Sequence, residues 1–289
     1  MKPATSKPEN ATDIEWFYLK LSFVFVSLPL TGIMVFGGSG CPFPTGICKL
    51  YSFAPLFTPI GKPILVSVFV LLCVFYLFEI RMLLATFFLF LLSCIIISHH
   101  ESNGIFYRAT ILTTLWGVQF LAYLRLRLNP DFDVRHFRVH YGIQIIAATY
   151  ALAGIAKLRA SGIDWINAGD FFSIQVIKNY AYLYFDTGSE TTWQEGKTIA
   201  YFLLNHHEII RFFLAVALML EVFCLAATLG ANMRYVFGIG LLFMHIGIAF
   251  IMGIGISVIA KPMIVFFFNP LYQSRRFIIF VNNKIRFFH

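Results

Sequence analysis

Residues 144–157, QIIAATYALAGIAK, form a continuous apolar segment that ends on a lysine, and residues 158–169, LRASGIDWINAG, follow it as a polar turn. The segment predicts a helix within a membrane, because its only charged residue stands at the end. A lysine in hydrocarbon costs about 2.5 to 3.5 kcal/mol at a helix centre, and less near an end where its stem reaches the interface. Lys157 is therefore either an interface anchor or a functional group.

The composition of the whole chain is that of an integral membrane protein. Of its 289 residues, 59% are hydrophobic and 12% are charged, and the mean hydropathy is +0.77. The 34 Phe residues and the long uncharged runs exceed what a soluble core of this length could bury, so lipid must solvate much of the surface. The formal net charge of +8 comes from Lys and Arg residues between apolar runs, as in loops at the cytoplasmic leaflet. We therefore expect a lipid bilayer as partner and no nucleic acid.

The apolar runs predict an all-α fold, a polytopic bundle of about eight transmembrane helices. A polar tail at residues 1–14 and a basic tail at residues 271–289 flank a membrane domain at residues 15–270. The first five spans are expected at residues 15–36, 64–78, 82–98, 106–124 and 139–157, the sixth at 209–229, and two more within 234–270, around a break at 253–262.

The basic segment Arg125–Arg138 sets the predicted orientation, because it is the densest short basic loop in the interior of the chain. If this loop is cytoplasmic, both termini are cytoplasmic too, and Lys157 lies on the outside of the cell (inner) membrane. Residues 159–205 contain no convincing span. They predict an external helical cap between spans five and six.

The pair Cys41 and Cys48 falls in the first predicted external loop. Oxidising surroundings and nearby turn formers favour a structural disulfide between them. Free thiols and a redox-active pair are the alternatives, and C-x6-C is not a recognised metal or thioredoxin spacing.

Two histidine pairs occur at predicted membrane boundaries, in HHE at residues 99–101 and again at residues 206–208. Adjacent side chains on a helix diverge by about 100°, so hydrogen bonding at the interface is favoured over metal binding. We predict no metal site. A substrate-binding role is the remaining alternative.

Glu221 and His245 are ionisable residues near the middle of predicted spans. Such residues are rare and face the interior of a bundle or a water-filled cavity. Either the two satisfy each other or nearby backbone groups, or together with Lys157 they line a cavity that opens outward.

The segment from Tyr150 to Gly169 resembles a known signature. Tyr150-x3-Gly154-x2-Lys157-Leu, followed by Trp165-x3-Gly169, is similar to the Y-x3-G-x2-K-L…W-x3-G pattern of the HTTM family, the membrane domain of vitamin K-dependent gamma-glutamyl carboxylase. The similarity extends to Glu221 and to Phe243-Met-His245, and it covers about residues 99–270.

The resemblance implies a site and a reaction. Lys157 would be the base that deprotonates a reduced quinone, with His245 and Glu221 as further catalytic residues. A base must be neutral near pH 7, and burial at the membrane edge disfavours the charged form. The implied substrate-binding residues are His99, His100, Asn103, Tyr150, Asp164 and Trp165. The counterpart of the large luminal domain of the carboxylase is missing from this sequence, so we do not expect glutamate carboxylation by this chain alone.

Short bacterial members of the family include the sporulation-delaying protein B type, which is implicated in maturing a secreted peptide toxin with a small partner protein. Three functions are therefore expected as alternatives. The first is an enzyme that uses Lys157 on a quinol-like or peptide substrate, and the second is a non-catalytic maturation or assembly factor. The third is a quinone-linked thiol oxidoreductase of the DoxX-like kind, which would use Cys41 and Cys48.

Overall fold

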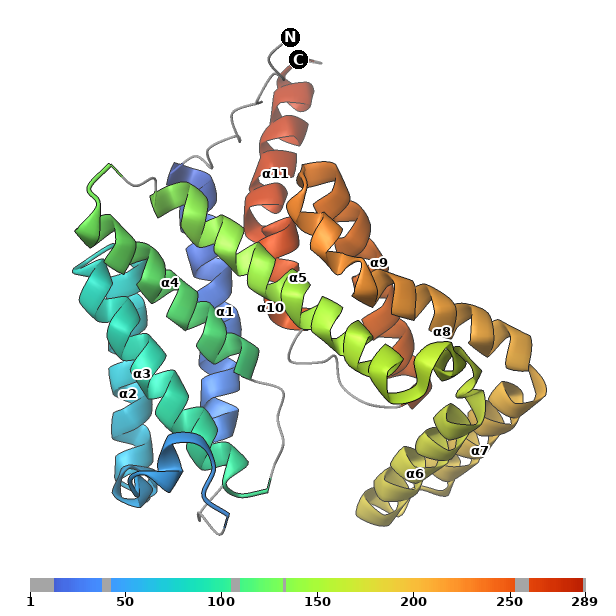
Figure 1. Ribbon diagram of the computed structural model, residues 1–289. Helices are drawn as coiled ribbons and strands as arrows, with labels where there is room; N and C mark the ends of the chain where they lie inside the picture. Colours follow the sequence, from blue (N-terminus) through green and yellow to red (C-terminus); the bar gives the residue numbers. More distant parts are fainter. Residues whose placement is uncertain (1–12, 38–42, 105–109, 132–133, 253–259, 288–289) are drawn as a thin grey trace. The chain divides into compact units, whose positions relative to one another are not determined.

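The computed structural model describes residues 13–37, 43–104, 110–131, 134–252 and 260–287 (Figure 1). These residues are helical or in short connections and include no strand, as the all-α prediction requires. The chain divides into two compact units, one of residues 1–145 and 261–289 and the other of residues 146–260. The helices α5 and α10 cross the boundaries, and the units are described one at a time.

The helices of the first unit are α1 (Asp13–Phe36), η1 (Gly46–Lys49), η2 (Ala54–Phe57), α2 (Gly61–Leu77), α3 (Met82–Glu101), α4 (Thr110–Leu128), the first part of α5 (Val134–Ser161), α10 (Ala260–Phe268) and α11 (Pro270–Phe287). The second unit holds the rest of α5, η3 (Gly162–Asn167), α6 (Gly169–Thr187), α7 (Glu190–Asn205), α8 (His207–Val222), η4 (Cys224–Thr228) and α9 (Ala231–Met252).

Several helices are long and apolar enough to cross a bilayer. Four stretches of the described chain qualify, namely Asp13–Phe36, Met82–Glu101, Phe137–Asn167 and Ala231–Met252. A fifth results if α7 and α8, which meet at a bend of 89°, together form one broken span. These helices are consistent with a multi-pass membrane protein. The prediction of eight spans stays a prediction, because α2 is a shorter apolar helix and α10 has only nine residues.

Trp116 lies at the centre of the first unit and has no exposed surface. Its ring centroid is 4.5 Å from that of Phe23 on α1 and 5.0 Å from that of Tyr76 on α2. Phe69 completes the cluster at 6.3 Å. The tilted contact with Phe23 and the edge-to-face contacts with Tyr76 and Phe69 connect α4 with α1 and α2.

In the second unit, α6 and α7 form a helical hairpin (Figure 1). The turn uses Gly188 at a φ of 67°, which ends α6, and Ser189, whose hydroxyl accepts a hydrogen bond from the Thr192 N–H and begins α7. Gly196 lets α7 approach α6 closely, because a Cβ at this position would overlap Tyr180.

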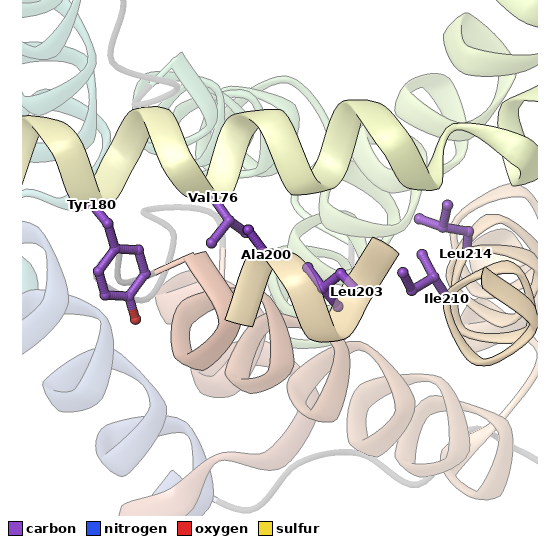
Figure 2. Close-up of a cluster of buried hydrophobic side chains, with 6 residues drawn as sticks. All are labelled: Val176, Tyr180, Ala200, Leu203, Ile210 and Leu214. Carbon is purple, nitrogen blue, oxygen red and sulfur yellow. The ribbon is translucent and has the colours of Figure 1, made fainter. Parts of the chain in front are cut away.

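The buried cluster of the hairpin continues into α8, and Figure 2 shows its six side chains between the ribbons of these helices. The members are Val176, Tyr180, Ala200, Leu203, Ile210 and Leu214. The structure thus has amphipathic helices where the sequence predicted a cap. Their external location is a separate prediction.

One expectation about the basic segment Arg125–Arg138 was wrong. Most of it is helical rather than loop, since α4 continues to Leu128 and α5 begins at Val134. Arg138 is also only 2% exposed, whereas a loop cation would be solvated. The reason is that Arg138 has buried polar partners, described below.

Two other expectations concern residues that the structure does not describe. Cys41 lies outside the described residues, so its disulfide with Cys48 stays a prediction, and Cys48 itself is buried in η1. The predicted break that starts at Gly253 also falls in an undescribed segment, residues 253–259.

Candidate functional site

Lys157 and Glu221 meet in the second unit. The Lys157 Nζ lies 2.6 Å from Glu221 Oε1 and 2.5 Å from Oε2, so one ammonium contacts both carboxylate oxygens. The Glu221 side chain is 7% exposed and the Lys157 side chain 30% exposed. A buried carboxylate is stable only with such a partner, so Lys157 is more than an interface anchor.

Gly154 explains how α5 and α8 come close enough for this contact. A Cβ on Gly154 would lie 2.8 Å from Val222 Cγ2 and 3.1 Å from Glu221 Cβ, so only glycine fits. Gly154 is one helical turn before Lys157 on α5. The glycine of the signature therefore places the end of α8 opposite the lysine.

Trp165, in the 3-10 helix η3 that follows α5, lies close to the lysine. The Lys157 Nζ is 4.6 Å from the centroid of the Trp165 ring, which is within range of a cation–π interaction. The sequence Gly162-Ile-Asp164-Trp165 turns the chain back after α5, with Gly162 at a φ of 62°.

A pocket of about 590 Å³ adjoins Trp165. Its lining includes Asp164, Trp165, Asn167, Phe171, Phe172 and Gln175. This volume is in the range of small-molecule sites. The predicted binding residues Asp164 and Trp165 therefore line one concave surface, and Trp165 connects that surface with the ion pair.

Tyr150 and His245 form a second polar pair. The Tyr150 hydroxyl is 2.6 Å from His245 Nε2, and the two residues are 4% and 9% exposed. Tyr150 and Lys157 are seven residues apart on α5, so two turns separate them on one face of the helix. The structure thus pairs Glu221 with Lys157, and Tyr150 with His245.

His99, His100 and Asn103 belong to the first unit, at the end of α3. The His99 ring stacks on Phe57 with 3.5 Å between centroids, and His100 Nδ1 lies 3.3 Å from the Met34 carbonyl oxygen. The Asn103 Nδ2 donates to the His99 carbonyl at 2.9 Å. These contacts are those of a packed helix end. Among the residues described, no cluster of three or more His, Cys, Asp or Glu could hold a metal ion.

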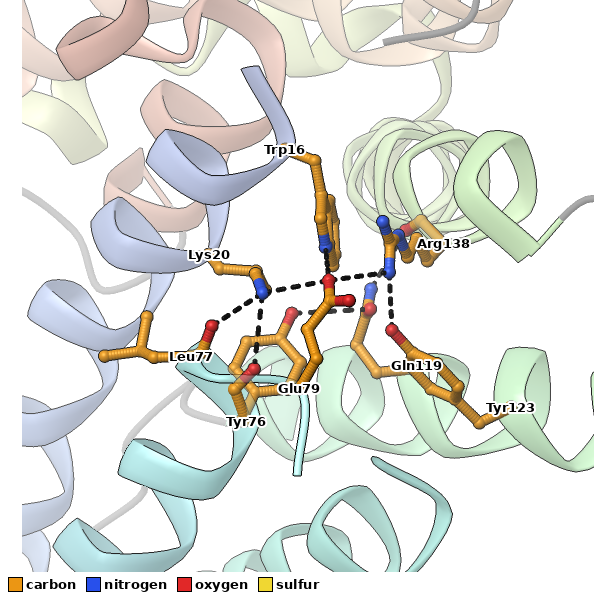
Figure 3. Close-up of polar contacts among 8 residues, drawn as sticks. All are labelled: Trp16, Lys20, Tyr76, Leu77, Glu79, Gln119, Tyr123 and Arg138. Carbon is orange, nitrogen blue, oxygen red and sulfur yellow. Dashed lines mark hydrogen bonds and ion pairs between the residues drawn. The ribbon is translucent and has the colours of Figure 1, made fainter. Parts of the chain in front are cut away.

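A further polar network in the first unit was missed by sequence reasoning (Figure 3). At its centre Glu79 Oε1 lies 3.0 Å from Lys20 Nζ, 2.9 Å from Trp16 Nε1 and 3.7 Å from Arg138 Nη1. Lys20 and Arg138 are each only 2% exposed. Glu79 stands in the tight connection between α2 and α3, at a φ of 58°.

Other groups of this network also contact the two cations. Lys20 also donates to the Leu77 carbonyl at 2.8 Å, and Arg138 donates to the Tyr123 hydroxyl at 2.5 Å. The guanidinium of Arg138 stacks over Trp16, with 3.3 Å between Cζ and the ring centroid. One carboxylate thus links α1, α5 and the connection after α2. The available signal was Lys20, a charge that interrupts the first apolar run.

The Glu79 carboxyl has a lowered pKa. Burial by itself raises the pKa of a carboxyl group, but hydrogen bonds from Lys20 and Trp16 and the charges of Lys20 and Arg138 outweigh burial here. Glu79 is therefore ionised at neutral pH. We interpret the network as a structural link between helices rather than a catalytic site.

Comparison of the chain with protein-family models, curated proteins and solved structures gives no match. The similarity to the HTTM signature therefore depends on the motif residues themselves. The geometry adds that the amine of Lys157 and the carboxylate of Glu221 are in contact, and that Trp165 connects this pair with a pocket.

Proposed function

We propose that the chain is a multi-pass membrane enzyme in which the Lys157–Glu221 pair moves a proton to and from a substrate. The observation that carries this proposal is the placement of the pair. The Lys157 Nζ contacts a buried carboxylate and also lies 4.6 Å from the centroid of an aromatic ring that lines the 590 Å³ pocket.

The pair suits acid–base chemistry for a physical reason. Transfer of a proton from the Lys157 Nζ to the Glu221 carboxylate gives an amine that can act as a base, and the reverse transfer restores the ion pair. The neutral amine can then take a proton from a weakly acidic substrate. Glu221 then returns its own proton to the deprotonated substrate, and the resulting carboxylate pairs with the ammonium of Lys157.

The resemblance to the HTTM family supplies the substrate class and the setting of this proposal. The substrate is quinol-like or a peptide, a reduced quinone is the candidate cofactor, and the process is maturation of a secreted peptide with a small partner protein. The site faces outward from the cell membrane, both termini are cytoplasmic, and the α6–α7 hairpin belongs to the external cap of an eight-span bundle.

A non-catalytic maturation or assembly factor is the second candidate. It is favoured by the burial of Glu221, because a buried ion pair can hold α5 against α8 without taking part in any reaction. The thiol oxidoreductase depends on Cys41, which lies outside the described residues.

Lys157→Arg separates the first two candidates. Arginine keeps the charge and can still contact Glu221, but it does not lose its proton near neutral pH. We expect normal protein levels and loss of function, scored as complementation of a deletion strain and by mass spectrometry of secreted peptides. Lys197→Arg is the matched control, because Lys197 also lies over a tryptophan ring, 4.9 Å from Trp193. An active Lys157→Arg protein would favour the assembly factor.

The proposed orientation has its own test. A single cysteine at Ser189, in a chain without native thiols, should react with an impermeant thiol reagent in intact cells, and a cysteine at Asp133 should not. The opposite labelling pattern would reverse the topology and place the Lys157 site on the cytoplasmic side.

A further inference from the structure

The pocket beside Trp165 carries an unbalanced negative charge. Asp164 is the charged residue of its lining, and Lys157 is not part of the lining and is neutralised by Glu221. Asp164 makes no hydrogen bond or ion pair with any residue that the structure describes. Asp170, a few residues later, differs in this respect, since its Oδ1 lies 3.7 Å from His207 Nδ1.

The aromatic lining of the pocket also suits a cation. Trp165 already has one ammonium over its ring, that of Lys157. Phe171 is 76% exposed, and Phe172 is partly buried and packs against the buried cluster of the hairpin. The faces of such rings attract cations, and their apolar surface accommodates an alkyl stem.

The polar groups that line the pocket favour a ligand that carries hydrogen-bond donors. Gln175 donates one amide N–H to Asn179 Oδ1 at 2.9 Å, and its carbonyl oxygen is an acceptor that a ligand can use. Asp164 supplies only acceptors when it is ionised. A ligand with several N–H donors and a positive charge matches these groups better than a neutral ring does.

We propose that this pocket binds a cationic amine on an apolar stem, that is, an ammonium or guanidinium group of a peptide. The inference rests on the proposed function and narrows it, because it selects a peptide over a quinol as the molecule held beside Lys157 and Glu221. Asp164 pairs with the cation, and the rings of Trp165 and Phe171 contact its stem.

The test uses the full chain in zwitterionic nanodiscs and four small probes. The probes are 2-phenylethylamine, which is protonated at pH 7, the neutral 2-phenylethanol, the anionic 3-phenylpropionate and hydroquinone. Binding is measured by saturation-transfer NMR, and the signal of protein-free nanodiscs is subtracted. We expect the amine to bind at least ten times more tightly than the other three. Equal or tighter binding of the alcohol, the acid or hydroquinone overturns the proposal.

Variants then locate the amine. Asp164→Asn should weaken amine binding at least tenfold, Asp164→Glu should retain it within about threefold, and Asp170→Asn, the matched carboxylate control, should leave it unchanged. Undiminished binding to Asp164→Asn overturns the assignment. Because Asp164 is exposed, thermal unfolding of Asp164→Asn should match that of the wild type, so that weaker binding is not confused with misfolding.

Failure of this inference is distinguishable from failure of the proposed function. If the wild type does not bind the amine while Lys157→Arg is inactive, the pocket assignment falls and the acid–base proposal stands. If the amine binds and Lys157→Arg is active, the pocket assignment stands and the acid–base proposal falls.

Discussion

Gly154 of α5 faces Val222 of α8 so closely that a Cβ on the glycine would lie 2.9 Å from the Val222 backbone nitrogen. Backbone cannot move aside as a flexible side chain can. The separation of the two helices at this point, and with it the contact between Lys157 and Glu221, is therefore set by the absence of a side chain at residue 154.

Gly154→Ala should consequently push α5 and α8 apart. We expect a loss of about 1 to 3 kcal/mol in the free energy of unfolding, the usual cost of overpacking, together with loss of function. Denaturant titration in detergent measures the first. Gly247→Ala on α9 is the control, because nothing lies within 4 Å of a Cβ there. Equal effects of the two substitutions would contradict the close contact.

Removing one partner of the Lys157–Glu221 pair should cost more than removing both. Lys157→Met leaves the carboxylate of Glu221 buried without a counter-charge, which costs about 3 to 5 kcal/mol. The double variant Lys157→Met with Glu221→Met removes both charges and should recover most of that stability while remaining inactive. A double variant as unstable as the single one would show that the pair is not coupled in this way.

Glu79 should make the first unit sensitive to acid. Because its folded-state pKa is lowered, its contribution to stability is fully present above the unfolded value of about 4.3 and is lost as the pH falls through the folded value. Glu79→Gln should lower the stability at pH 7 by on the order of 1 kcal/mol, since solvent screens a half-exposed carboxylate. The difference from wild type should shrink below pH 4. Glu195→Gln, on the exposed face of α7, should behave like wild type throughout.

The bond between Tyr150 and His245 should be visible in a double-mutant cycle. Tyr150→Phe removes the hydroxyl and leaves the buried Nε2 of His245 without this partner, which should cost about 1 to 3 kcal/mol. Combined with His245→Leu, the two changes should be non-additive by at least 0.5 kcal/mol. Tyr182→Phe, at a tyrosine that is 74% exposed, is the control and should change stability little. Additive effects would mean that the contact contributes nothing to stability.

The sequence was sufficient to single out Glu221, but not to name its partner. A carboxylate in an apolar helix requires a compensating group, and only three-dimensional packing selects Lys157, which is 64 residues away, rather than His245. Similarly, Tyr150 could be recognised as part of a signature, whereas its bond to a residue 95 positions later could not.

Lys20 and Arg138 show where hydropathy reasoning fails. It treats every lysine or arginine as a solvated charge, so Arg138 was predicted to lie in a loop, and Lys20 was not predicted to have a buried partner. Both are buried because one carboxylate, in a connection of only a few residues, reaches them. Hydropathy also identifies apolar segments more reliably than it gives the number of membrane-spanning helices. The lengths of α2, with 17 residues, and of α10, with nine, do not decide whether these helices cross the membrane.

The burial of Lys20 has a consequence for biogenesis. The ribosome completes α1 before it makes Glu79, which follows Lys20 by 59 positions, and at 5 to 20 residues per second this interval lasts about 3 to 12 s. During that time the ammonium of Lys20 lacks its carboxylate and the carbonyl groups at the end of α2. We therefore expect α1 to reach its final packing only after the connection between α2 and α3 has been made, so that these three helices assemble together rather than one after another.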